Sequence, residues 1–289
     1  MIPAYPVTKP MFPNAPPRST KAKEPAPETR LADGSSVAPN RLATKALCQQ
    51  GPASLQAVDI HMSLSKRTIL NGISIAIQQR EIVGIFGPDG AGKSTTLLCL
   101  AGLLRSDLGR ILLNGEDVST LPFYRRAILG IGYLPQQPSI FKGLTVAQNV
   151  MSTLEVVEPN PLARESRLAD LLASLHIDGL RDAKATSLSG GERRRCEVAR
   201  ALAVEPLFML LDEPFAGIDP ITIASIKSLV LDMRDRGIGV LLTDQNVPEM
   251  LEIIDRAYVI DKGSLIFSGT PDAMLQDSLV IERYLGRDR

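Results

Sequence analysis

The residues Gly87-Pro-Asp-Gly-Ala-Gly-Lys93-Ser94 follow the pattern G-x-x-x-x-G-K-[ST], which is the strongest structural signal in this chain. The apolar run Glu81–Phe86 before them is expected to be a buried central strand, and the run Lys93–Gly102 is expected to be a helix. Glycines let the backbone curl so that its N–H groups point inward, and the N-terminus of the helix favours an anion. The order of strand, loop and helix therefore predicts a phosphate-binding loop.

The residue types of this loop predict how it holds a nucleotide. Lys93 is expected to reach the β- and γ-phosphates, and Ser94 is expected to ligate Mg²⁺. Asp89 brings a carboxylate close to the phosphates, so we expect its side chain to point outward. The predicted cradle consists of Gly87, Pro88, Asp89, Gly90, Ala91, Gly92, Lys93, Ser94 and Thr95.

Strand-like and helix-like segments alternate around this loop from about residue 53 onward. The expected strands are Ser54–Ile60, Ile69–Gln78, Leu207–Leu211, Gly239–Thr243, Arg256–Ile260 and Ser264–Ser268. The expected helices are Ile221–Arg236, Val247–Ile254 and most of residues 145–185. The first two strands are expected to form an antiparallel pair and the last two a hairpin, whereas the alternation of strands and helices between them predicts an α/β fold with a parallel sheet.

A second motif is the run Phe208-Met-Leu-Leu-Asp212-Glu213, an apolar strand that ends in two carboxylates. Alone, it could be a strand that simply meets solvent. Beside a phosphate-binding loop, Asp212 at the carboxyl end of a central strand is expected to hold Mg²⁺, and Glu213 is expected to orient or deprotonate an attacking water. We therefore take Glu213 as the candidate catalytic base.

The third motif, Leu188-Ser-Gly-Gly-Glu192, completes a set that resembles the ATP-binding cassette family over about residues 53–289. The resemblance implies a phosphate-loop NTPase core with a mixed sheet, an antiparallel β subdomain and a helical subdomain at about residues 140–190. It implies ATP and Mg²⁺ as ligands. It also implies that Ser189, Gly190 and Gly191 bind the γ-phosphate held by a second copy, so that a head-to-tail homodimer encloses two ATP molecules.

The same resemblance implies roles for two residues whose function cannot be inferred from their spacing alone. Gln136, in Tyr133-Leu-Pro-Gln136-Gln, falls in the loop that senses Mg²⁺ and the γ-phosphate and contacts a membrane subunit, so it is taken as both a catalytic and a metal-binding residue. Asp219, in Phe215-Ala-Gly-Ile-Asp219, falls in the loop that couples the two nucleotide sites.

Longer strings narrow the resemblance within the family. The segments at residues 132–150, 188–203, 210–223 and 243–250 and the terminal Arg283-Tyr-Leu-Gly286 resemble ATPases that power lipopolysaccharide export on the cytoplasmic face of the inner membrane. Two transmembrane permease subunits are the implied partners, with a coupling helix near Gln136, Phe141 and Lys142. Branched-chain amino-acid import ATPases share many of these strings and remain the alternative. The basic run Arg193–Arg195 is typical of a solvated helix face.

Two positions depart from the family pattern. The segment Thr243-Asp-Gln245-Asn has Gln245 where the resemblance implies a γ-phosphate-contacting histidine, so Gln245 is taken as a catalytic residue. An amide donates a hydrogen bond but carries no positive charge, so slower ATP hydrolysis is expected. Leu64 stands where an aromatic residue is expected to stack on adenine, so weaker and less selective base binding is expected. These departures leave a second hypothesis open, a nucleotide-dependent clamp in which hydrolysis is negligible.

The composition excludes several other classes of protein. The chain has 32 Lys and Arg residues against 32 Asp and Glu residues, and a nucleic-acid binder normally has a basic excess. No apolar stretch reaches the length of about 18 residues that a membrane-spanning helix needs. The three cysteines, Cys48, Cys99 and Cys196, are far apart and suggest no disulfide framework. Residues 1–52 are rich in proline and are expected to be a disordered tail before the ATPase domain at 53–289.

Overall fold

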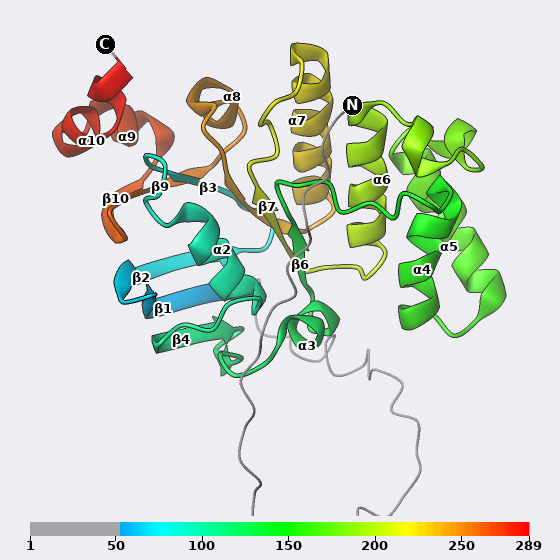
Figure 1. The fold of residues 1–289 in the computed structure, drawn as a ribbon, viewed down its shortest axis with the longest axis horizontal. Helices are drawn as coiled ribbons and strands as arrows, with labels where there is room; N and C mark the ends of the chain where they lie inside the picture. Colours follow the sequence, from blue (N-terminus) through cyan, green and yellow to red (C-terminus); the bar gives the residue numbers. More distant parts are fainter. Residues whose placement is uncertain (1–52, 289) are drawn as a thin grey trace, which may run out of the picture. The chain divides into compact units, whose positions relative to one another are not determined.

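The computed structural model describes residues 53–288, and the tail expected at residues 1–52 lies outside the described residues. A six-stranded sheet carries the order β10-β9-β3-β8-β7-β6, with β3 beside β8 and β9 (Figure 1). Its strands are β3 (Ile82–Phe86), β6 (Ile131–Leu134), β7 (Phe208–Asp212), β8 (Gly239–Thr243), β9 (Arg256–Asp261) and β10 (Ser264–Gly269). All neighbouring pairs are parallel except β9 and β10, so the sheet is mixed, as the family resemblance implies.

Strand β3 shows why this sheet is buried on both faces. All five of its residues are buried, and successive side chains alternate between two hydrophobic cores. Ile82 and Phe86 belong to the core that the helices from α4 (Val146–Val157) onward share, while Val83 and Ile85 belong to the core shared with α2 (Lys93–Ala101) and the second sheet. A run that is apolar at every position is the pattern expected of a parallel strand covered on both sides.

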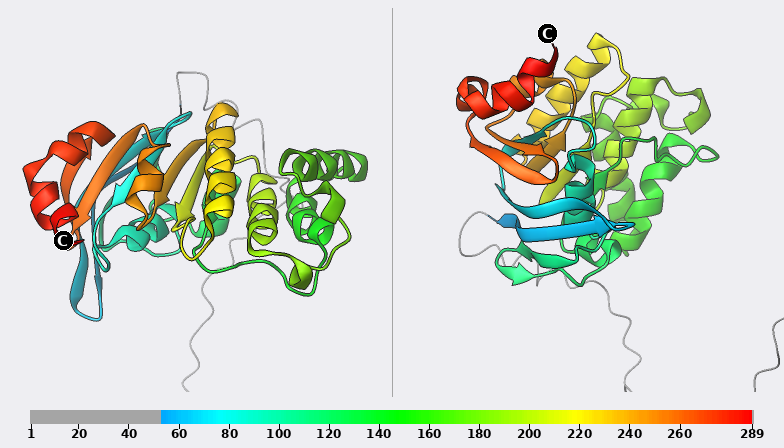
Figure 2. Two further views of the ribbon diagram at one scale, coloured as in Figure 1. Left: turned by 90° about the horizontal axis from the view of Figure 1, so that it is seen from above. Right: turned by 60° about the vertical axis from the view of Figure 1, so that its left-hand side comes forward.

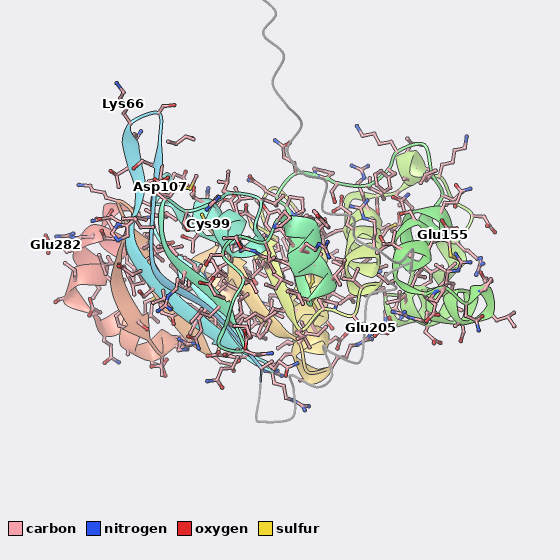
Figure 3. All side chains as sticks on the ribbon, turned by 90° about the horizontal axis from the view of Figure 1, so that it is seen from below. Lys66, Cys99, Asp107, Glu155, Glu205 and Glu282 are labelled. Carbon is pink, nitrogen blue, oxygen red and sulfur yellow. The ribbon has the colours of Figure 1, made fainter. Side chains whose placement is uncertain are left out.

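A four-stranded antiparallel sheet packs against the second of these cores. Its order is β2-β1-β4-β5, with the strands β1 (Ser54–Leu64), β2 (Arg67–Gln78), β4 (Leu108–Leu113) and β5 (Glu116–Asp117). Strand β1 was expected to end at Ile60 but continues to Leu64 through a β-bulge, at which Asp59 has a φ of 51°. The bulge fits against Gly109 of β4, where an added Cβ would lie 2.3 Å from the Asp59 carbonyl oxygen. Figure 3 shows Lys66 at the outer tip of the β1–β2 hairpin.

The helices lie at the two ends of the six-stranded sheet and on both of its faces, with α2 and α3 in one hydrophobic core and the later helices in the other. They are α3 (Phe123–Ile128), α4 (Val146–Val157), α5 (Pro161–Ser174), α6 (Gly190–Leu202), α7 (Pro220–Asp235), α8 (Val247–Leu251), α9 (Pro271–Gln276) and α10 (Ser278–Arg283), with 3₁₀ turns at Asp178–Leu180, Ala185–Ser187 and Leu285–Asp288. In both views of Figure 2, α4–α6 (green) stand beyond the β6 edge, and α9 and α10 (red) stand at the β10 edge. None of the helices in residues 53–288 combines the length and apolarity needed to cross a lipid bilayer.

Several boundaries differ from the sequence patterns, for local reasons. No strand or helix is predicted between residues 103 and 144, where the structure has β4, β5, α3 and β6. These elements are short, and β6 has only four residues, so they are too short to show a periodic pattern of apolar residues. Helix α8 ends at Leu251 rather than Ile254, because the Asp255 N–H donates to the Ile82 carbonyl oxygen at 2.8 Å and draws the chain onto the start of β3.

The carboxyl end of α2 is held by one buried cation. Arg126 of α3 is 2% exposed, and its guanidinium donates to four backbone carbonyls. Two of these, Cys99 and Leu100, belong to the last turn of α2, at 2.7 and 2.8 Å, and the others are Leu121 and Ser119, both at 2.9 Å. A cation at a helix carboxyl end is favourable because the free carbonyls there carry partial negative charge. Arg126 therefore fixes the helix that begins at the phosphate loop.

Replacing Arg126 with Met is expected to lower the free energy of unfolding by about 3 to 5 kcal/mol, because four carbonyls lose a charged donor in a buried place. Urea unfolding followed by circular dichroism measures the change. The matched control is Arg125→Met, since Arg125 is the exposed neighbour and its loss is expected to cost less than about 0.5 kcal/mol. Equal losses for the two variants would show that Arg126 does not hold α2.

Candidate active site

The phosphate loop lies between β3 and α2, and two of its glycines are required by close contacts. Gly87 has a φ of +143°, and an added Cβ would lie 2.0 Å from the Ile260 carbonyl oxygen. At Gly92, with a φ of +109°, the Cβ would lie 2.8 Å from Leu70. Gly90 has nothing within 4 Å of its Cβ position, so the loop is open there. The loop backbone thus packs closely against neighbouring residues at Gly87 and Gly92 and is uncovered at Gly90. A loop that binds a ligand needs such an uncovered side.

Lys93 is folded back over this loop. Its side chain is 5% exposed, and Nζ donates to the carbonyl oxygens of Gly87 at 2.7 Å and Pro88 at 3.2 Å. Burial lowers the pKa of Lys93, and the carboxylates of Asp89 and Glu213 oppose that shift. A cation held on backbone oxygens at the start of α2 is placed to meet an anion at the same helix N-terminus.

The loop forms the floor of a cleft of about 680 Å³. The cleft is lined by Arg67, Thr68, Ile69, Pro88, Asp89, Gly90, Ala91, Gly92, Lys93, Ser94, Thr95, Glu213, Asp261 and Lys262. Nearly the whole of the predicted cradle therefore shares one cleft with the candidate base. Arg67, Thr68 and Lys262 were not predicted from the sequence, because they come from β2 and the β9–β10 turn, and no motif marks them.

Asp212, at the end of β7, joins the loop to the neighbouring strands. Its Oδ1 accepts hydrogen bonds from Ser94 Oγ and Thr243 Oγ1, both at 2.8 Å, and its Oδ2 accepts one from the Tyr133 hydroxyl at 3.2 Å. Burial first, and then the Asp212 charge, raise the pKa of Tyr133, so the phenol stays a donor. The predicted pair of Ser94 and Asp212 is thus in direct contact, whereas the contacts of Tyr133 and Thr243 with Asp212 were not predicted from the sequence.

These oxygen donors fit Mg²⁺. The ion favours a few carboxylate and hydroxyl oxygens together with substrate phosphates over a cage made only by protein. Within residues 53–288 no group of three or more His, Cys, Asp or Glu side chains could hold a metal ion by itself. The contact between Ser94 Oγ and Asp212 Oδ1 is the kind of partial donor set that phosphate oxygens complete.

Glu213 follows Asp212 directly in the chain. Its φ of 45° is rare for a residue with a side chain, and its N–H donates to the Thr243 carbonyl oxygen at 2.9 Å and to Thr243 Oγ1 at 3.2 Å. The carboxylate Oε2 accepts a hydrogen bond from Gln136 Nε2 at 2.5 Å. Burial, followed by the nearby Asp212 charge, raises the pKa of Glu213. The structure thus brings Gln136 and Glu213 together, as a water-activating pair requires.

The segment that carries Gln136 is anchored on α6. Glu197, 3% exposed, accepts hydrogen bonds from the N–H groups of Ser139 at 2.6 Å and Ile140 at 3.1 Å. Arg194 Nη1 donates to the Pro135 carbonyl oxygen at 2.9 Å and to Glu197 at 3.3 Å. The basic run Arg193–Arg195, predicted as a solvated face, is therefore half-buried, because its side chains hold neighbouring segments.

Gln245 also reaches the loop. Its Nε2 donates to Asp89 Oδ1 at 2.9 Å. The Asp89 side chain is 80% exposed, but it lines the cleft with its carboxylate 4.0 Å from Lys93 Nζ, so it does not point away from the phosphate site as expected. The contact with Gln245 was not predicted. The preceding Asp244 is buried and accepts hydrogen bonds from the N–H groups of Phe215 at 2.7 Å and Asn246 at 2.9 Å, which fix the backbone beside Gln245.

Nine of the predicted site residues do not line the cleft. Four of them, Gly87, Gln136, Asp212 and Gln245, are hydrogen-bonded to residues that line it, and the other five lie elsewhere. Leu64 is 61% exposed at the end of β1, outside the cleft that Arg67 lines. Ser189 caps α6 in a capping box with Glu192, and Gly190 and Gly191 begin that helix. Asp219 caps α7 and accepts hydrogen bonds from the N–H groups of Ile221 and Thr222, both at 3.1 Å. The resemblance predicts that Ser189, Gly190 and Gly191 act on a partner copy.

Comparisons with known proteins agree with this geometry. The chain is 48% identical over 232 residues to the lipopolysaccharide export system ATP-binding protein LptB of Acidithiobacillus ferridurans, covering 80% of this chain and 96% of that protein. It is 46% identical over 237 residues to LptB of Escherichia coli (strain K12), covering 82% and 98%. The crystal structure of an ATP-binding cassette of an ABC transporter in its ADP conformation matches with a TM-score of 0.73 and 28% identity, covering 81% of this chain and 99% of that one.

The family described as ABC transporter matches residues 70–216, which run from β2 through the phosphate loop and the helical region to the residues after Glu213. The matched span contains Lys93, Gln136, Ser189 and Asp212. Together with the fold and the relatives, this match shows that the chain is an ATP-binding protein of the ABC transporter family.

Proposed function

We propose that the chain binds Mg-ATP in the cleft above the phosphate loop and hydrolyses it with Glu213 as the general base. The observation that carries this proposal is the contact of Gln136 with Glu213 at 2.5 Å, beside the contact of Ser94 with Asp212 at 2.8 Å. One pair is suited to hold a water and the other a cation. Both meet at the carboxyl edge of the parallel sheet, where α/β proteins bind their ligands.

The predicted residues of the site divide the steps of this reaction among them. The N–H groups of the loop and Lys93 would hold the β- and γ-phosphates, and Ser94, Asp212 and Gln136 would hold Mg²⁺, which neutralises phosphate charge. Glu213 accepts a proton from the attacking water as its oxygen bonds to the γ-phosphorus and the bond to the β–γ bridging oxygen breaks, giving ADP and phosphate. A raised carboxylate pKa makes Glu213 a stronger base, so kcat is expected to fall as the pH drops through that pKa.

The active state is proposed to be a homodimer. Gly190 and Gly191 form the first turn of α6, where the N–H groups have no partner within the helix, and Ser189 caps that turn with its own N–H bonded to Glu192. None of the three lines the cleft of its own chain. A helix N-terminus that is exposed and turned from its own phosphate site is suited to bind the phosphate of a second copy. Asp219, which caps α7, would lie near the same interface and couple the two sites.

A groove beside α6 supports a membrane partner. It has a volume of about 440 Å³, and its lining includes Leu103, Phe123, Tyr133, Ser139 and Arg200. Arg200 lies over the Phe141 ring at 4.8 Å, and its Nη1 is buried with no hydrogen-bond partner in the described residues. An apolar groove with one free cationic donor fits a short amphipathic helix that carries a carboxylate. Phe141, 51% exposed, and its neighbour Lys142 would contact that coupling helix of a permease subunit.

We infer that the cargo is lipopolysaccharide and that the chain acts on the cytoplasmic face of the inner membrane. The relatives named LptB support this cargo, since the chain spans nearly their whole length. Branched-chain amino-acid import remains the alternative. Purification of the complex from its own cells, with this chain tagged, tests the choice by mass spectrometry of the membrane subunits. Lipopolysaccharide-export subunits are expected, and amino-acid permease subunits would contradict the assignment.

A nucleotide-dependent clamp is the second candidate, and Gln245 favours it. The amide offers a hydrogen bond but no charge where the resemblance implies a histidine. In a clamp, ATP would close the dimer without being hydrolysed. Measured ATP turnover separates the two candidates. Faster turnover by the wild-type chain than by a Glu213→Gln chain supports the hydrolase, and equal turnover supports the clamp.

A further inference from the structure

The contact between Asp89 and Gln245 joins two parts of the site that are 156 residues apart in the chain. Asp89 belongs to the phosphate loop, and Gln245 follows β8, whose last residue, Thr243, is hydrogen-bonded to Asp212. A carboxylate only accepts hydrogen bonds, so the amide group that faces Asp89 must be the NH₂ of Gln245. The chemistry of the two side chains therefore sets the orientation of the amide.

The backbone on both sides of Gln245 is already fixed. Asp244 accepts hydrogen bonds from two N–H groups, and the Val247 N–H donates to the Gln245 carbonyl oxygen at 3.0 Å. The side-chain torsions of Gln245 are the remaining degrees of freedom. Without a partner, the side chain would sample several rotamers and both amide orientations. An amide turned the wrong way would present its carbonyl oxygen to phosphate oxygens, which is an unfavourable contact between acceptors. The hydrogen bond to the Asp89 carboxylate disfavours that orientation of the amide.

We propose that Asp89 is a positioning residue for nucleotide recognition: it accepts one N–H of the Gln245 amide and so directs the second N–H toward the terminal phosphate of ATP. This inference rests on the proposed function, because it assigns the terminal phosphate to this cleft. In this arrangement an uncharged side chain, held by an acidic partner, makes the contact with the phosphate.

The solvent exposure of Asp89 distinguishes a positioning role from a role in stabilising the fold. The side chain is 80% exposed, and an exposed hydrogen bond contributes little to folding. The carboxylate also stands 4.0 Å from Lys93 Nζ, where it competes with phosphates for the cation. Loss of Asp89 frees Lys93 for phosphates of both nucleotides, so it is expected to leave stability nearly unchanged and ADP binding equal or tighter, while weakening the preference for ATP over ADP.

A double-mutant cycle tests the pair. Asp89→Ala, Gln245→Ala and the double variant are made in a Glu213→Gln chain, so that ATP persists, and ATP and ADP affinities are measured at concentrations at which chains do not associate. Each single change is expected to lower the ATP-to-ADP preference about tenfold, the value of a hydrogen bond to a charged acceptor. The double variant is expected to lose no more than either single one, because the two groups act as a unit.

Two controls complete the design. Asp89→Asn keeps the shape and one acceptor oxygen, and it is expected to retain at least a third of the preference. Glu116→Ala, on the exposed strand β5, is expected to change nothing. A normal ATP preference in Asp89→Ala, or losses that multiply to about a hundredfold in the double variant, would overturn the positioning role. Failure of the parent chain to bind either nucleotide would instead contradict the proposed function.

Discussion

Replacing Lys93 with Met is expected to lower the affinity for Mg-ATP by about two to three orders of magnitude, because a buried cation that meets phosphates carries a charge-assisted contact. Met keeps the apolar stem of the side chain, so the packing of the loop is preserved. Lys93 is the cation placed at the start of α2, 2.7 Å from the Gly87 carbonyl oxygen. Equilibrium binding of a fluorescent ATP analogue measures the loss.

The matched control is Lys184→Met, which removes an exposed lysine far from the loop in sequence. It is expected to leave the affinity within about a factor of two, since surface charges away from the site contribute little. Thermal unfolding of both variants shows whether the fold is intact. Similar losses of affinity in the two variants would mean that net charge, and not the placement of Lys93, governs binding.

Replacing Gly190 with Asp is expected to reduce ATP hydrolysis by at least about two orders of magnitude while each chain still binds ATP. The new carboxylate would face the γ-phosphate of the partner copy, and like charges repel in the closed dimer. Nothing lies within 4 Å of the Cβ that this change adds. An acidic residue in the first turn of α6 is also compatible with the helix dipole, so the fold is expected to persist.

Gly190→Ala is the control for this prediction, because it adds a Cβ without a charge. It is expected to retain most of the hydrolysis, whereas the Asp variant loses it. Hydrolysis is measured by phosphate release, and ATP binding is measured separately on dilute protein. Weakened ATP binding by dilute Gly190→Asp would place this helix N-terminus in the cleft of its own chain and contradict the shared site.

Much of the fold could be predicted because its central elements are long apolar runs beside a specific motif. The run Glu81–Phe86 and the strand Gly239–Thr243 were found because strands covered on both faces are apolar throughout. β4 and β6 were missed because their stability comes from pairing with distant strands, β1 and β7, and not from a local pattern. The bulge at Asp59 was missed for the same reason, since its partner is Gly109 of another strand.

The candidate site was predicted where residues follow a motif and missed where they meet across strands. Ser94 and Asp212, 118 residues apart, were assigned to one metal site and lie in contact. The hydrogen bonds from Tyr133 and Thr243 to Asp212 depend on the pairing of β7 with its neighbours β6 and β8. The register of these strands cannot be read from the spacing of residues in the sequence. The contact of Asp89 with Gln245 likewise depends on the strand order β3-β8, which places the phosphate loop beside the end of β8.

The central claim is that this chain hydrolyses ATP with Glu213 as the base. Its most direct test is steady-state phosphate release at saturating Mg-ATP by the complex with its membrane subunits, compared with the same complex carrying Glu213→Gln. The amide keeps the size of the side chain but accepts no proton, so turnover is expected to fall by about two orders of magnitude or more, with ATP still bound. Equal phosphate release by the two complexes would contradict the assignment of Glu213 and the hydrolytic function proposed for the site.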